Sequence, residues 1–159
     1  MKKKEKVEFS PEQGEIVVMG QRGVLLDIVS CCEKLDEMLG TGAEVVVHHM
    51  WYGYGCQLLK NLTEKIGDAE KGKVLEELAK INAEMGLGVL NFTIIGKKRP
   101  YVEITVKNPP FKKIKGSVKR CITSLWAGIF SEYFQKQMVC EESHYDQKTD
   151  TFTFTLRQT

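Results

Sequence analysis

CITSLWAGIFSEYF, residues 121–134, is the stretch that most constrains the fold of this chain. Its apolar residues recur at helical spacing, and it belongs to a helix that we expect to span residues 117–134. Two stretches with the pattern of strands follow it, at 138–144 and 151–156. The last third of the chain therefore predicts a helix that leads into a pair of strands.

Upstream of this helix the sequence predicts further helices and strands. Glycines and prolines separate them, with Gly40 placed to end the first helix. The expected elements are strands at 7–10 and 15–19, helices at 24–39, 41–66 and 72–85, and hairpin strands at 89–95 and 101–106. This order predicts the α+β class, with an antiparallel sheet covered by about four helices. We expect an N-terminal basic segment and first strand over 1–13, and a single domain over 14–159.

Composition excludes several classes of protein. With 159 residues, 42% of them hydrophobic, the chain fits one compact domain. No apolar run reaches the roughly 18 residues of a membrane-spanning helix, and the lysine-rich start is not followed by the apolar core of a signal peptide. The 5 cysteines follow no disulfide-scaffold spacing, which predicts reduced thiols and a cytoplasmic location. No phosphate-binding loop, CxxC motif or GxSxG motif is present.

Basic residues gather around the expected hairpin and the start of the last helix. No aromatic residues are interleaved with them as in proteins that bind single strands, and the net charge is only +2. We therefore interpret them as a solvated face, and the sequence argues against a nucleic-acid partner. The residues are Lys97, Lys98, Arg99, Lys112, Lys113, Lys115, Lys119 and Arg120.

The second helix contains an unusual stretch, HHMWYGYGC at 48–56. A glycine inside a helix costs about 1 kcal/mol relative to alanine, so Gly53 and Gly55 need a compensating role. One role is close packing against another backbone, and the other is room for a ligand between aromatic walls. The second role predicts an apolar ligand-binding pocket lined by His49, Trp51, Tyr52, Gly53, Cys56 and Trp126.

Three possible metal ligands lie in the last third of the chain. Cys121, Glu141 and His144 carry the thiolate, carboxylate and imidazole groups that zinc prefers. Glu141 and His144 lie an odd number of residues apart, so a regular strand places them on opposite faces unless a bulge intervenes. The alternative interpretation is that they are ordinary surface residues.

The order of these patterns resembles the 4-vinyl reductase domain family over nearly the whole chain from about residue 14. The family is similar in fold to subunits of the transport-protein-particle (TRAPP) tethering complex. The stretches that carry the resemblance are Gly14-Glu-Ile through Gly20-Gln-Arg-Gly-Val-Leu-Leu-Asp27, Tyr52-Gly-Tyr-Gly55, Gly86-Leu-Gly-Val-Leu90, and Cys121 ahead of Ala127-Gly-Ile-Phe130.

The resemblance implies a module that binds small or hydrocarbon molecules, as in the phenol-sensing domains of transcription activators. In those sensors a cysteine before the last helix and a later Glu-x-x-Cys…Cys-x-Phe segment hold zinc. Carried over, Cys121, Glu141 and His144 occupy the first three ligand positions, and Phe154 matches the closing phenylalanine. Phe152 stands at the fourth ligand position, which implies either an incomplete zinc site or a branch without zinc whose phenylalanines pack in the core.

These observations favour a non-catalytic binding domain for a small apolar ligand. The resemblance also implies a homodimer, through the N-terminal elements or the second helix, and a structural zinc. Two alternatives remain open at this stage. One is an enzyme that uses an open zinc position on a small substrate, and the other is a scaffold or tethering subunit.

Overall fold

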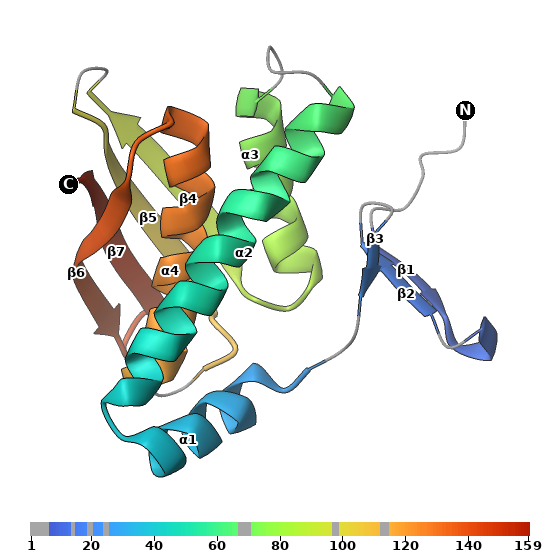
Figure 1. The fold of residues 1–159 in the computed structure, drawn as a ribbon, viewed down its shortest axis with the longest axis horizontal. Coiled ribbons are helices and arrows are strands. Elements are labelled where there is room, and N and C mark those ends of the chain that lie inside the picture. Colours follow the sequence, from blue (N-terminus) through green and yellow to red (C-terminus); the bar gives the residue numbers. More distant parts are fainter. Residues whose placement is uncertain are drawn as a thin grey trace.

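The computed structural model describes residues 7–13, 15–18, 21–23, 26–66, 71–96, 99–111 and 115–159. Its elements follow the expected order closely (Figure 1). They are β1 (Val7–Ser10), β2 (Glu15–Val18), β3 (Gln21–Gly23), α1 (Ile28–Leu39), α2 (Gly42–Ile66), α3 (Lys71–Glu84), β4 (Val89–Ile95), β5 (Tyr101–Lys107), α4 (Gly116–Phe134), β6 (Met138–Asp146) and β7 (Thr151–Gln158), with a 3-10 turn at Pro11–Gln13.

The strands form two antiparallel sheets rather than the single sheet expected. The C-terminal sheet has the order β4-β5-β7-β6, and the N-terminal sheet has the order β1-β2-β3. Gly23 pairs with Ile16 as part of β3, a strand that is absent from the elements expected from the sequence. A strand of three residues is too short to show an alternating pattern, which explains the difference.

The N-terminal sheet stands apart from the remaining elements (Figure 1). Phe9 on β1 is 60% exposed. Because β1 pairs with β2 along four residue pairs, the domain boundary expected after residue 13 falls between two strands of one sheet. That boundary stays a prediction, and residues 1–6 and Gly14 lie outside the described part of the chain.

The main core lies between the C-terminal sheet and the helices. Helix α4 (orange in Figure 1) lies between α2 and the sheet. Its Trp126 and Phe130 pack in one buried cluster with Phe152 and Phe154 of β7. The two β7 phenylalanines therefore pack in the core. A second buried cluster joins α1, α2 and α4 through residues that include Cys32, Val47 and Cys121.

Helix α1 begins four residues later than the sequence predicted. Asp27 caps it, because its Oδ1 accepts hydrogen bonds from the amides of Val29 at 3.1 Å and Ser30 at 3.2 Å. Residue 24, the predicted start, lies outside the described residues. The predicted end is confirmed, since Gly40 adopts a φ of +54° and donates its amide to the carbonyl of Asp36.

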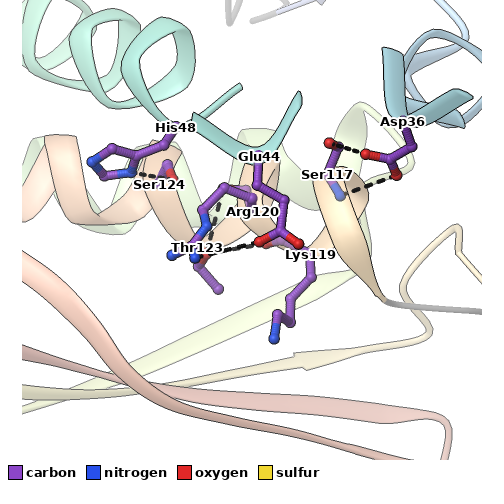
Figure 2. Close-up of polar contacts among 8 residues, drawn as sticks. All are labelled: Asp36, Glu44, His48, Ser117, Lys119, Arg120, Thr123 and Ser124. Atoms are coloured by element: carbon purple, nitrogen blue, oxygen red, sulfur yellow. Dashed lines mark hydrogen bonds and ion pairs between the residues drawn. The ribbon is translucent and has the colours of Figure 1, made fainter. Parts of the chain in front are cut away.

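Asp36 of α1 also caps α4 from outside that helix (Figure 2). Its carboxylate accepts hydrogen bonds from the hydroxyl of Ser117 and, at 3.3 Å, from the amide of Ser117. A carboxylate at a helix N-terminus satisfies amides that have no partner inside the helix and complements the helix dipole. This contact fixes α1 against the start of α4.

Among the helices in the described ranges, none is long and apolar enough to cross a membrane. Four of the basic residues considered above, Lys97, Lys98, Lys112 and Lys113, lie outside the described residues.

Candidate functional site

A pocket of about 260 Å³ lies between the first turns of α2, the middle of α4 and the start of β6. Apolar side chains from each of the three elements supply part of its wall, and polar side chains from the two helices supply the rest. The lining residues are Glu44, Val45, His48, Arg120, Thr123, Ser124, Ala127, Val139 and Cys140.

Two polar contacts across the pocket join α2 to α4 (Figure 2). The Nη2 atom of Arg120 lies 3.4 Å from Oε2 of Glu44. One turn further along both helices, Nδ1 of His48 lies 2.8 Å from the hydroxyl oxygen of Ser124. The two pairs are spaced four residues apart on each helix, so both pairs lie on facing sides of the two helices.

The charges of these groups differ. Burial, and then the positive charge of Arg120 and the neighbouring His49, lower the pKa of His48 below its ordinary value. His48 is therefore neutral at pH 7, and Arg120 and Glu44 are the ionised groups of the lining. Cys140 is half-buried, and burial raises the pKa of its thiol, while Arg120 and Lys119 act in the opposite direction. Cys140 is therefore a thiol rather than a thiolate at pH 7.

Two turns beyond His48, the helices touch backbone to backbone. A Cβ atom built on Gly55 would lie 2.2 Å from the carbonyl oxygen of Leu125, and one built on Gly128 would lie 2.1 Å from that of Tyr52. The thiol of Cys56 donates a hydrogen bond of 3.2 Å to the carbonyl of Gly128 at the same point. Close packing, the first of the two roles considered for the glycines, is thus the role of Gly55. Gly53 is exposed, and a Cβ there would meet nothing within 4 Å.

Ser131 joins three elements next to this crossing. Its buried hydroxyl donates to the carbonyl of Ala127 at 2.6 Å and accepts from the hydroxyl of Tyr52 at 2.9 Å and from the amide of Met138 at 2.8 Å. The hydroxyl of Tyr52 is thereby committed to a structural contact between α2 and α4.

The structure places the six predicted ligand-binding residues outside the pocket lining. His49 and Gly53 are exposed, Trp126 is a core residue, and Trp51 packs on the second buried cluster. Tyr52 and Cys56 are engaged at the helix crossing. One sequence signal could have indicated the observed pocket. Each of the two helices carries two polar residues four positions apart, Glu44 and His48 on α2 and Arg120 and Ser124 on α4, which places them on one face of their helix.

The three predicted metal ligands are not brought together. Cys121 is buried among apolar side chains of the second cluster, and burial raises the pKa of its thiol. Glu141 is the extra residue of a bulge in β6 and forms an ion pair of 2.7 Å with Arg157. His144 pairs with Thr153, so it faces away from the sheet side that carries Phe152 and Phe154.

The sheet thus separates His144 from the helix that carries Cys121. Among the described residues, no group of three His, Cys, Asp or Glu side chains is placed to hold a metal ion. These side chains do not fit the zinc site that the resemblance implies, and zinc stays a prediction.

No protein-family model matches the chain, and no curated protein matches it in sequence. Solved structures do match. The phenol-responsive sensory domain of the transcription activator PoxR, solved with phenol, superposes with a TM-score of 0.69 at 12% sequence identity, covering 96% of this chain and 85% of that one. A vinyl-4-reductase family protein from Methanocaldococcus jannaschii gives a TM-score of 0.56 at 20% identity, covering 87% of this chain and 84% of that one. The chain therefore has the vinyl-4-reductase-like fold, as its sequence patterns predicted.

Proposed function

We propose that this protein is a small-molecule-binding domain and that its ligand occupies the pocket between α2, α4 and β6. The observation that carries the proposal is the composition of the pocket wall. Val45, Ala127 and Val139 provide apolar surface from three elements, and polar side chains of α2 and α4 supply the rest of the wall. Ligand sites typically combine apolar walls with a small number of placed polar groups. The phenol-responsive domain of the same fold supports this proposal by analogy.

Two substitutions on the same turn of α2 test the location of the site. Val45 lines the pocket and is exposed, so Val45→Trp will cover the pocket mouth without disturbing the core. Val46 is also exposed but does not line the pocket, which makes Val46→Trp the matched control. We expect small aromatic probes, measured by calorimetric titration, to bind the parent protein and Val46→Trp and to lose affinity for Val45→Trp. Equal binding to all three proteins would place the ligand elsewhere.

We further propose that two copies of the chain associate through the outer face of α2. Apolar side chains project from this face, with Met50 60% exposed and Tyr54 51% exposed. Gly53 lies between them with nothing near its Cβ position, which permits close approach of a second helix. Met38 and Leu39 at the end of α1 are exposed apolar side chains as well. Contiguous exposed apolar side chains of this kind are typical of association surfaces.

Sedimentation equilibrium tests the association. Met50→Glu places a charge in the proposed interface and is expected to shift the protein from dimer to monomer. Gln147→Glu adds the same charge at an exposed position in the turn between β6 and β7, away from α2, and serves as the control. A monomeric parent protein, or a dimer that Met50→Glu leaves intact, would contradict this proposal.

The cysteines of the chain, all free in this structure, support the further proposal of a reducing, cytoplasmic setting.

A further inference from the structure

We infer that the ligand of this pocket is a small organic acid, whose carboxylate pairs with Arg120 while its apolar part lies against Val45, Ala127 and Val139. This inference rests on the proposed function, because it names the chemical class of ligand for the same site. It depends on the state of Arg120, the local balance of charge and the size of the pocket.

Arg120 is held loosely by its partner within the protein. The Arg120–Glu44 contact is a single one of 3.4 Å, and the side chains are 39% and 36% exposed. A well-formed pair between guanidinium and carboxylate is shorter, about 2.7–2.9 Å, and is often bidentate. Exposed ion pairs also contribute little stability. The guanidinium therefore has donor capacity left for a second carboxylate that enters the pocket.

The local charge favours an anion over a cation. His48 is neutral at pH 7, so the ionised groups that line the pocket are Arg120 and Glu44. Lys119 directly precedes Arg120 on α4 (Figure 2) and adds a second positive charge, which acts on the thiol of Cys140 in the lining. Two cations thus act on the pocket against one carboxylate. A ligand with one negative charge would bring these charges into balance.

The volume limits the apolar part of the ligand. A pocket of about 260 Å³ holds roughly nine water molecules at the volume that each occupies in the liquid. This room suits a single ring or a short branched chain that carries one carboxylate. Its position against β6 also brings the ligand next to Val139 and Cys140.

Three probes of one shape, namely benzoate, benzamide and benzylamine, separate the ligand classes. Calorimetric titration at low ionic strength is expected to give the tightest binding for benzoate, a weaker signal for benzamide and none for benzylamine. Salt should weaken the binding of benzoate and leave that of benzamide unchanged. Benzamide binding as tightly as benzoate would overturn the inference and leave the proposed function intact. No binding of any probe would contradict both.

Substitutions at the two charged lining residues then test the residue assignment. Arg120→Met keeps an apolar stem but removes the guanidinium, and is expected to weaken benzoate binding about tenfold to a hundredfold, with little effect on benzamide. Glu44→Gln removes the competing carboxylate and is expected to strengthen benzoate binding, on the order of fivefold. Arg157→Met removes a positive charge from β7, outside the pocket lining, and controls for net charge. Weaker benzoate binding by Glu44→Gln, or unchanged binding by Arg120→Met, would overturn the inference.

Discussion

The two ends of the α2–α4 pair are built in opposite ways. At one end, Gly55 and Gly128 bring the two backbones into contact, and no side chain separates the helices. At the other end, polar side chains of Glu44, His48 and Arg120 span the gap between the helices, and a pocket remains beside them. The glycine end fixes how the helices cross, while the polar end leaves space that a ligand can fill.

This difference in construction predicts a difference in tolerance to substitution. Backbone atoms in direct contact cannot move aside, so the crossing should be sensitive to a single methyl group. The exposed Glu44–Arg120 ion pair contributes little to stability, so this part of the pocket end should accept changes that alter binding instead.

Gly128→Ala should have the largest effect. Its Cβ would lie 2.1 Å from the carbonyl oxygen of Tyr52, so the helices must separate. We expect a loss of about 3 kcal/mol or more in the free energy of unfolding, measured by urea denaturation. Gly72→Ala on the exposed surface of α3 is the control, and should be stabilising by up to about 1 kcal/mol because alanine favours helix. Equal effects of the two substitutions would refute the close contact.

Ser131→Ala should have the next largest effect, because it removes the acceptor that the buried amide of Met138 uses. A buried donor left without a partner costs about 1–3 kcal/mol. Tyr52→Phe removes only one donor to the same hydroxyl and should cost about 1 kcal/mol. The comparison of the two variants in thermal or urea unfolding checks this order. A larger loss for Tyr52→Phe would show that Ser131 is not the residue that joins the three elements.

Asp36→Ala tests the contact at the start of α4, where Asp36 of α1 caps that helix. Loss of a capping side chain costs about 0.5–2 kcal/mol, and we expect a value near 1 kcal/mol in urea unfolding. Asp36→Asn should recover part of this loss, since an amide oxygen can still accept from Ser117. A full loss with Asp36→Asn would instead point to the negative charge at the helix terminus as the main contribution.

The smallest effect concerns the pH dependence of stability. Burial lowers the pKa of His48 in the folded protein, and the positive charge of Arg120 and the neighbouring His49 lower it further. The unfolded chain therefore binds a proton at His48 more readily than the folded protein does, and folding becomes less favourable as pH falls below about 6.5. The stability that neutral His48 contributes is fully present above about pH 6.5. It is lost as the pH falls from there through the lower pKa that His48 has in the folded protein. His48→Gln should reduce this slope, while an unchanged slope would rule out His48 as its source.

Most of the fold could be predicted from the sequence, because periodicity and glycine stops act locally. The start of α1 was missed because Asp27 caps the helix through a side-chain hydrogen bond, which an apolar pattern does not reveal. The separate N-terminal sheet was missed because β3 has only three residues. The family resemblance identified the fold although no family model matches the chain.

The candidate site was much less predictable. Trp51, Tyr52 and Cys56 stood out by residue type, yet their directions depend on where α4 crosses α2, which the helical pattern does not determine. The zinc prediction depended on which face of β6 carries Glu141 and which carries His144. The bulge at Glu141, which the sequence allowed, leaves Glu141 paired with Arg157 and His144 away from the core. Residues that meet across two helices are positioned by tertiary packing, which spacing within one helix does not report.

The most direct test of the pocket is a titration of the ¹⁵N-labelled protein with benzoate, followed by amide chemical shifts. Binding in the pocket predicts saturable shifts at Val45, His48, Arg120, Ser124 and Val139, with little change at Gly55 and Gly128 where the helices are in contact. Shifts centred on Gly55 and Gly128, or on the N-terminal strands, with none around Arg120 would contradict it.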